Sequence, residues 1–253
     1  FIFSHTKTEI TNLESQDRAI DLITNMGGRR EGYPVRSLFS VKFQGLDEDG
    51  LPTFLNEKGN VTSDNINFQE RENLDFLQYE GPTDPTIQGS LGNIFKYKGF
   101  ALNVFMTYSF GNVVRLDPVF SATYSDLSSM TKEFKNRWVQ PGDEKYTDVP
   151  VILSYYQYQN NKQLRYGYNA YNYSDVRIAK GDFIRMKEIS LSYDFPKAWI
   201  HPLNNLSLKL QATNLFLIYA DKKLNGQDPE FFRSGGVSSP VPRQFTLTVK
   251  VGL

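Results

Sequence analysis

The sequence predicts an all-β fold: a segment of an antiparallel transmembrane β-barrel with about seven strands, long extracellular loops and one short loop helix. Three observations lead to this fold class. Segments of about ten residues alternate between apolar and polar side chains, as membrane strands do when one face meets lipid and the other meets water. Short connections between these segments alternate with long ones. Aromatic residues make up 14% of the chain, with 19 Phe and 15 Tyr against 2 Trp, which suits strands with aromatic girdles.

The alternation is clearest at the C-terminal end, where every second residue from Phe245 to Leu253 is apolar. Residues 206–216 and 100–110 repeat this pattern, and weaker alternation marks two further segments. The first segment reads as a strand with poor alternation. The seven predicted strands are residues 1–14, 35–46, 87–97, 100–110, 183–195, 206–216 and 245–253.

The strand at 183–195 contains a change of phase. Its apolar residues occupy even-numbered positions at Ile184 and Met186 and odd-numbered positions from Ile189 onward. One extra residue near Lys187 and Glu188 would restore a single apolar face, so we predict a β-bulge there. The alternative is that the strand begins at Glu188.

With this alternation, the charged residues in the middle of the strands all lie on the face opposite the apolar one. A Lys or Arg that faced lipid at mid-bilayer would cost roughly 2–4 kcal/mol, so a slip of one residue in a single strand would be expensive. The residues concerned are Lys42, Arg185, Lys187, Lys209 and Lys250.

Connection length predicts the orientation of the strands. Residues 97–99 make a tight hairpin and 196–205 a modest turn, whereas 47–85, 111–182 and 217–242 are long. Such lengths are uncommon in a compact soluble domain, where the median connection is roughly 4–6 residues. Short turns on one side and long loops on the other are typical of outer-membrane barrels, with the short turns in the periplasm. The long connections are therefore predicted to be extracellular.

One helix is predicted inside the long connection at 111–182. Met130, Phe134 and Trp138 recur at four-residue spacing, and Ser128 or Ser129 could cap the helix. We expect this apolar stripe to pack on the barrel rim rather than to bind a partner helix.

Composition argues against several other functions. The 28 basic and 28 acidic residues balance, whereas nucleic-acid binding needs a cationic surplus. No apolar run is long enough for a transmembrane helix. Cysteine is absent, and His5 and His201 lie far apart without a metal or triad pattern, so we expect no enzyme, no cofactor and no metal site. The acidic run 47–50 lacks the calcium-loop spacing and is interpreted as a polar turn.

An ordered set of short motifs resembles the C-terminal part of the SusC/RagA family, the TonB-linked nutrient importers of Bacteroidetes. The motifs cover most of the chain, which departs from the family in ending with Leu253 rather than an aromatic residue. The matching segments are Glu31–Val35, Phe43–Asp47, Asp49–Pro52, Gly81–Pro85, Phe95–Phe100, Tyr108–Gly111, Arg137–Trp138, Thr147–Pro150, Phe183–Tyr193, Asn214–Phe216, Asp228–Glu230 and Pro242–Thr246.

The resemblance implies a 22-stranded barrel in the outer membrane, of which residues 1–253 form the last part of the wall. It also implies an N-terminal plug, energy from TonB and a SusD-like surface lipoprotein as lid. Neither plug nor TonB box lies in this chain, which starts at Phe1 without Met and therefore reads as a piece of a longer protein. The implied function is active import of an oligomeric nutrient, either glycan or peptide, with the barrel, plug, lipid, TonB and lipoprotein as partners.

A tyrosine-rich run between Tyr146 and Tyr173 holds eight of the 15 tyrosines. Tyrosine offers a large amphipathic contact at low entropic cost, which suits a sugar, a peptide or a protein partner. Three roles are open: girdle or loop packing, which we favour, docking of the lipoprotein lid, and contact with substrate. The candidate contact residues are Trp138, Tyr155, Tyr156, Tyr158, Tyr166, Tyr168, Tyr171 and Tyr173.

The rival interpretation is a secreted β-sandwich that binds carbohydrate. It would account for the aromatic residues and the alternation. It does not account for the strand lengths, because sandwich strands are typically about 5–6 residues long.

Overall fold

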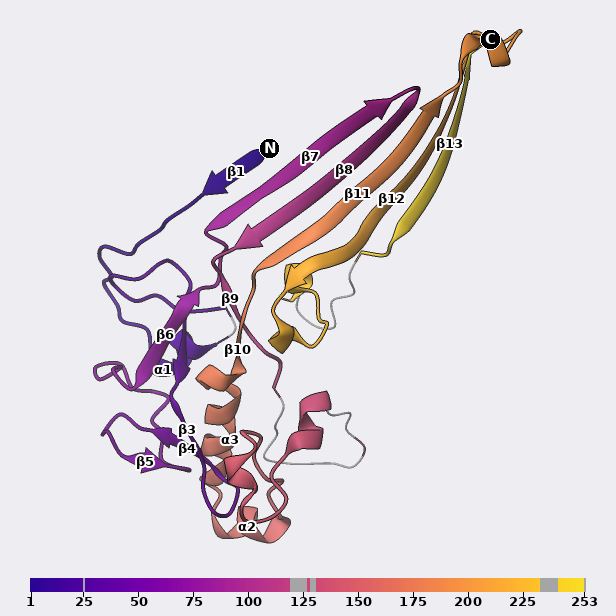
Figure 1. The fold of residues 1–253 in the computed structure, drawn as a ribbon. Helices are drawn as coiled ribbons and strands as arrows, with labels where there is room; N and C mark the ends of the chain where they lie inside the picture. Colours follow the sequence, from indigo (N-terminus) through magenta and orange to yellow (C-terminus); the bar gives the residue numbers. More distant parts are fainter. Residues whose placement is uncertain (25, 119–126, 128–130, 233–240, 253) are drawn as a thin grey trace. The chain divides into compact units, whose positions relative to one another are not determined.

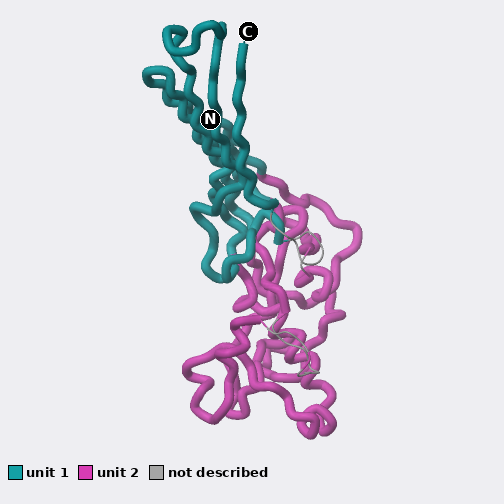
Figure 2. The backbone as a smooth tube through the Cα atoms, turned by 90° about the vertical axis from the view of Figure 1, so that its right-hand side faces the viewer, with its two compact units in different colours: residues 1–6, 85–112, 180–253 teal, residues 7–84, 113–179 magenta. Residues whose placement is uncertain are grey.

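The computed structural model describes residues 1–253 except for 25, 119–126, 128–130, 233–240 and 253. The chain divides into two compact units, coloured separately in Figure 2. Unit 1 comprises residues 1–6, 85–112 and 180–253, and unit 2 comprises residues 7–84 and 113–179. Unit 1 contains the long strands, and unit 2 is formed by two of the long connections.

Unit 1 is built on one antiparallel sheet whose strands follow one another in chain order (Figure 1). Each strand therefore pairs with its predecessor and its successor among the sheet strands, as in a β-meander. The predicted all-β antiparallel fold class is confirmed. The strands are β1 (Ile2–His5), β7 (Ile87–Tyr97), β8 (Phe100–Phe110), β11 (Phe183–Asp194), β12 (Asn205–Ala220) and β13 (Gln244–Gly252).

The pairing register places apolar side chains on one face of this sheet. Leu102 lies opposite Leu191, Leu191 lies opposite Leu210, and Leu210 lies opposite Leu247. Directly opposed residues share a face, so these four leucines form a row across β8, β11, β12 and β13. The β13 side chains at positions 245, 247, 249 and 251 are 51–72% exposed. Among the described residues of unit 1, no second sheet covers this stripe.

The predicted bulge is present in β11. Its register against β8 shifts between Met186 and Glu188, which leaves Lys187 as the extra residue of β11. Against β12 the register shifts at the same point, but there the extra residue lies on β12, between Thr213 and Phe216. Met186 pairs with Met106, and Ile189 pairs with Val104, so the apolar residues on both sides of the bulge return to one face. The change of phase in the sequence is therefore absorbed inside one continuous strand.

Aromatic rings lie at both ends of the apolar face, with aliphatic rows between them. At the β7–β8 turn, the rings of Phe100 and Tyr193 are 4.4 Å apart between centroids. At the opposite end, the Tyr108 ring lies 6.4 Å from Phe1 and 5.8 Å from Phe110. This distribution is the one expected for two aromatic girdles, and it comes from strand residues rather than from the tyrosine-rich run.

Short and long connections alternate as predicted. The β7–β8 turn consists of Lys98 and Gly99, whose φ angles of 44° and 86° fit a two-residue type I′ turn. Residues 195–204 join β11 to β12 and include the 3₁₀ helix η4 (Lys197–Trp199). The long connections are 6–86, 111–182 and 221–243, and they leave from the end of the sheet opposite these turns.

The prediction of a membrane strand at 35–46 is wrong. This segment forms two short strands of unit 2, β2 (Ser37–Val41) and β3 (Phe43–Leu46). Every residue of β2 is buried, so its apolar side chains serve a core rather than a lipid-facing surface. The β2 strand pairs with β6 (Leu77–Pro82), whereas β3 pairs with β4 (Pro52–Leu55), which in turn pairs with β5 (Val61–Thr62). The first predicted strand is also much shorter, because β1 ends at His5.

Unit 2 has its own hydrophobic core, in which Leu22, Phe39, Phe54 and Tyr171 are buried together. The single predicted loop helix is replaced by several short helices. A 3₁₀ helix, η1, covers Lys132–Asn136, while Ser128, Ser129 and Met130 lie outside the described residues. The remaining elements of unit 2 are α1 (Ala19–Ile23), β9 (Val113–Arg115), η2 (Asp143–Lys145), α2 (Tyr155–Asn160), α3 (Leu164–Asn172), η3 (Asp175–Arg177) and β10 (Ile178–Lys180), whose last residue belongs to unit 1.

Two 3₁₀ helices lie in the β12–β13 connection of unit 1, η5 (Lys222–Leu224) and η6 (Pro229–Phe231). Over the described parts of the chain, no helix has both the length and the apolar character needed to cross a membrane.

Candidate functional site

The tyrosine-rich run begins with α2, which presents two adjacent tyrosines to solvent. Ser154 caps the helix, because its hydroxyl accepts a hydrogen bond from the Gln157 amide and the Gln157 side chain bonds back to the Ser154 amide. This capping box places Tyr155 and Tyr156 in the first turn, where they are 79% and 74% exposed. An exposed pair of large amphipathic rings is a suitable contact surface for a partner.

Tyr168 and Tyr171 lie on α3 and are buried in the core of unit 2. The Tyr168 hydroxyl donates a 2.8 Å hydrogen bond to the Val151 carbonyl. Burial raises the pKa of both phenols above their ordinary value. These two predicted contact residues therefore pack the loop on itself, which is one of the roles that the sequence left open.

Three other candidates are partly buried. Tyr158 packs against the core, the Tyr166 ring lies 6.5 Å from that of Phe68, and the Tyr173 ring lies 6.4 Å from Phe68 at a steep angle. Phe68 therefore makes aromatic contacts with two of the three rings, those of Tyr166 and Tyr173. All three are less exposed than Tyr155 and Tyr156.

Trp138 is buried over a tight turn. A Cβ on Gly50 would lie 2.4 Å from the Trp138 ring, so the indole sits directly against the Gly50 backbone. Its Nε1 donates a 3.1 Å hydrogen bond to Glu144. These contacts fix Trp138 inside unit 2, where it is 8% exposed.

The acidic run beneath Trp138 is a polar turn. Asp47 Oδ1 accepts hydrogen bonds from the amides of Asp49 and Leu51, at 3.0 and 2.8 Å. Burial raises the pKa of Asp47. No cluster of three or more potential metal-ligating side chains occurs among the described residues.

Arg115 is an organising residue that the sequence did not reveal. Its side chain is 3% exposed and donates to backbone carbonyls of Ile23, Phe39 and Ser174, at 3.0, 2.6 and 3.1 Å. Its guanidinium also lies 5.6 Å from the centre of the Tyr173 ring. A single arginine in a three-residue strand carries no sequence signal for this role, because its acceptors are backbone atoms.

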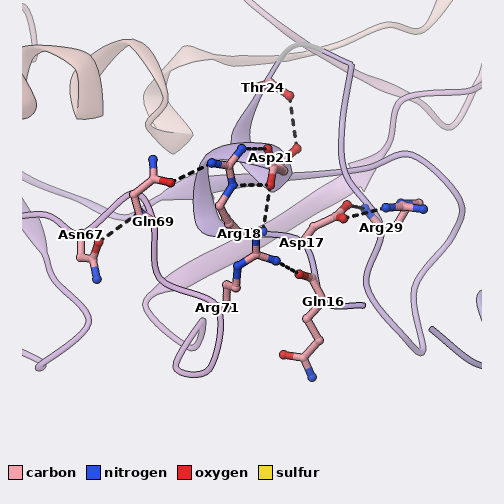
Figure 3. A network of polar contacts seen from close by, with 9 residues as sticks. All are labelled: Gln16, Asp17, Arg18, Asp21, Thr24, Arg29, Asn67, Gln69 and Arg71. Carbon is pink, nitrogen blue, oxygen red and sulfur yellow. Dashed lines mark hydrogen bonds and ion pairs between the residues drawn. The ribbon is translucent and has the colours of Figure 1, made fainter. Parts of the chain in front are cut away.

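A second polar network surrounds the start of α1 (Figure 3). Arg18 bonds to both carboxylate oxygens of Asp21, at 2.9 Å each, and to Gln69 at 2.8 Å. The hydrogen bond from Arg18 lowers the pKa of Asp21. A neighbouring ion pair joins Arg29 to Asp17, next to a hollow of about 220 Å³. In these pairs each charged side chain is neutralised by an opposite charge within the network, as expected of contacts that hold a loop in place.

The polar face of unit 1 carries a larger hollow of about 590 Å³ near the β7–β8 turn. Its polar lining consists of lysine, serine and asparagine side chains with one carboxylate, Asp194, and its apolar lining includes Ile94, Tyr97 and Phe100. Charged and hydroxyl groups of this kind favour a solvated or ligand-bound surface over an apolar contact.

A buried ion pair closes the other end of the same face. Arg185 on β11 pairs with Asp228, and its Nε lies 2.8 Å from a Glu230 carboxylate oxygen. Lys187 in the bulge pairs with Glu230 at 3.1 Å. The bulge therefore directs two cations toward the β12–β13 connection, which folds back over the polar face.

Comparison with known proteins supports the fold and the resemblance. No family model matches the chain. It is 29% identical over 159 residues to TonB-dependent receptor P39 of Formosa agariphila, an alignment that covers 60% of this chain and 14% of that receptor.

Solved structures agree at the level of the fold. A structure of the RagAB peptide transporter matches 88% of this chain and 23% of the transporter chain, with a TM-score of 0.61 and 20% identity. The same importer in an open-open state matches 86% of this chain, with a TM-score of 0.59 and 18% identity. The chain thus shares the fold of part of the RagAB transporter chain, and it spans less than a quarter of the relatives that it matches.

Proposed function

We propose that the chain forms part of the barrel wall and two extracellular loops of an outer-membrane importer that takes up an oligomeric nutrient, glycan or peptide, with energy from TonB. The wall would separate lipid from an aqueous path, and the loops of unit 2 would hold a surface lipoprotein. Transport of this kind needs no covalent chemistry from these residues.

The segregation of side chains between the two faces of the sheet carries this proposal. An 11-residue strand such as β7 or β8 runs about 36 Å at about 3.3 Å per residue. Tilted by about 45°, it crosses about 26 Å, close to the apolar band of about 25 Å in outer-membrane barrels. Aromatic rings flank aliphatic rows over this distance, on the face opposite Lys209 and Lys250.

A secreted β-sandwich fits less well. Its strands would be about half as long, and its apolar face would be covered by a partner sheet. In unit 1 the apolar side chains of β13 are 51–72% exposed, and no second sheet packs on them among the described residues.

Cysteine accessibility tests the assignment of the two faces. This chain contains no cysteine, so single cysteines at 245–250 would report one position each in the full-length membrane protein once any cysteine outside this chain is replaced by serine. We expect positions 245, 247 and 249 to react with a lipid-soluble maleimide, and positions 246, 248 and 250 to react with a water-soluble one. Equal reaction of both sets with the water-soluble reagent would contradict a lipid-facing stripe.

Uptake tests the transport function. Deletion of the full-length gene should abolish energy-dependent uptake of one class of labelled oligomer, peptide or glycan, and reintroduction of the gene should restore it. Unchanged uptake of both classes, or uptake that a protonophore leaves intact, would contradict active import through this protein.

We assign the lid contact to Tyr155 and Tyr156, because they are the two most exposed of the candidate tyrosines. Changing both to Ala should reduce the amount of surface lipoprotein that co-purifies with the full-length protein by about tenfold, as expected for loss of two aromatic interface residues. Gln159→Ala on the same helix is the matched control. Equal recovery from the double variant and the control would place the lid elsewhere.

A further inference from the structure

The polar face of the unit 1 sheet carries two lysines in one transverse row. Lys96 lies opposite Ala101, Ala101 opposite Ser192, and Ser192 opposite Lys209. Three strand spacings of about 4.8 Å separate the two lysines, which places their Cα atoms about 14 Å apart. Both lysines line the hollow of about 590 Å³, and Ser192 lies between them.

Within the described part of the chain, neither lysine takes part in an ion pair. The other charged residues that line the hollow are Lys98 and Asp194, so three cations face one carboxylate. By contrast, Arg185 and Lys187 near the opposite end of the face are paired with acidic residues. Among the residues that line the hollow, beside the β7–β8 turn, lysines therefore outnumber carboxylates three to one, whereas Glu188 on the same face is bonded to Asn103.

The hollow also offers neutral hydrogen-bonding groups. Ser190 and Asn103 lie opposite each other in the next row, one step toward the centre of the sheet. Asn103 donates a 3.0 Å hydrogen bond to Glu188, which fixes its amide. Hydroxyls and amides between two cations suit the polar backbone of an extended oligomer whose negative groups lie at its ends.

We propose that this lysine row binds anionic cargo, namely an extended oligomer with carboxylates about 14 Å apart, the distance across about four residues of extended peptide. The inference rests on the proposed import function and names the charge class of its substrate. An acidic peptide and a uronic-acid glycan share the carboxylate chemistry that the row recognises. The volume of the hollow lies within the range of about 300–1,000 Å³ that is typical of small-ligand sites.

The test uses purified full-length protein and matched probes. The peptide Asp-Ser-Ser-Ser-Asp is compared with Asn-Ser-Ser-Ser-Asn, and a uronic-acid oligosaccharide is compared with its neutral counterpart, by titration calorimetry at low and high salt. Binding is measured for wild type, for the double variant Lys96→Gln/Lys209→Gln, and for Lys58→Gln/Lys197→Gln. The last variant removes the same charge from two exposed positions that do not line the hollow.

For wild type we expect the anionic probe of one pair to bind about tenfold more tightly than its neutral partner at low salt, with a smaller preference at high salt. The double variant should lose the preference, and the control variant should keep it. The pair that shows the preference identifies peptide or glycan as the source of the carboxylates.

Three results would overturn the inference: no preference in wild type, no binding of any probe, or an unchanged preference in the double variant. A double variant that keeps the preference but loses thermal stability would instead assign the lysines to an acidic segment of the protein itself. Energy-dependent uptake of a neutral oligomer would leave the import function standing even if the lysine row fails.

Discussion

Arg115 donates a 2.6 Å hydrogen bond from Nη2 to the carbonyl of Phe39, which joins strand β9 to the buried strand β2. The same guanidinium reaches the last residue of α1, Ile23, and the C-terminal end of α3 at Asn172 and Ser174. Four backbone segments are therefore held by one side chain. Burial lowers the Arg115 pKa to about 10, so the group remains charged at neutral pH, where its hydrogen bonds are charge-assisted.

Arg115→Ala should destabilise unit 2 by about 3–5 kcal/mol, because several buried carbonyls lose their donors. Limited proteolysis of the full-length protein would show faster cleavage within residues 7–84 and 113–179. Arg165→Ala is the control, since Arg165 is exposed and its side chain bonds to the hydroxyl of its neighbour Tyr166. Equal cleavage rates for the two variants would show that Arg115 does not hold the segments together.

Gly50→Ala should displace Trp138 from its turn. The added Cβ would overlap the indole at 2.4 Å, and the φ of +74° disfavours any side chain. In full-length protein in which every tryptophan but Trp138 is replaced by Phe, we expect the fluorescence of Trp138 to shift toward longer wavelength. Gly59→Ala is a matched control with a φ of +76° and nothing within 4 Å of the added Cβ. If both variants kept the wild-type spectrum, the contact between Trp138 and Gly50 would be refuted.

The features that the sequence predicted well are local. The bulge at Lys187 follows from a change in parity within one strand, and the turn at Lys98 and Gly99 follows from two adjacent alternating segments. The apolar face of each strand can also be predicted from its own sequence, because apolar and polar residues alternate along it whatever strand lies beside it.

The fold of unit 2 was not predictable in the same way. The helices α2 and α3 consist largely of Tyr, Asn and Gln, whose helix propensities are mostly modest, so α3 depends on burial of Tyr168 and Tyr171 against distant segments. Likewise, the alternation at 35–46 could not reveal that β2 is buried on both sides by parts of the chain far away in sequence. In both cases, contacts with distant parts of the chain determine the structure of the segment.

The buried tyrosines predict a loss of stability at high pH. The pKa of Tyr168 is raised by burial, whereas an unfolded tyrosine releases its proton near its ordinary value of about 10. The folded state therefore binds more protons than the unfolded state above that pH, and stability falls as the pH rises. We expect Tyr168→Phe to reduce this fall between pH 10 and 12, as measured by thermal unfolding of the full-length protein. An unchanged pH dependence in the variant would mean that Tyr168 ionises freely in the folded state.

The pairing of Arg185 with Asp228 predicts that the β12–β13 connection is fastened to the polar face of the sheet. Both side chains are almost completely buried, and the Arg185 guanidinium lies between the Phe183 and Phe231 rings, 5.7 and 5.9 Å from their centres. Asp228 also caps η6 by accepting from the Glu230 amide, so its loss would release both the ion pair and the helix.

Asp228→Asn should leave Arg185 buried without its full counter-charge, at a cost of about 3–5 kcal/mol to the docking of this connection. Cleavage of residues 221–232 by added protease should accelerate in the full-length protein, while the barrel strands remain resistant. Arg185→Gln/Asp228→Asn removes both charges and should recover part of this loss, because no unpaired charge stays buried. Protection equal to wild type in Asp228→Asn, or a double variant as labile as the sum of the single variants, would show that the two residues act independently.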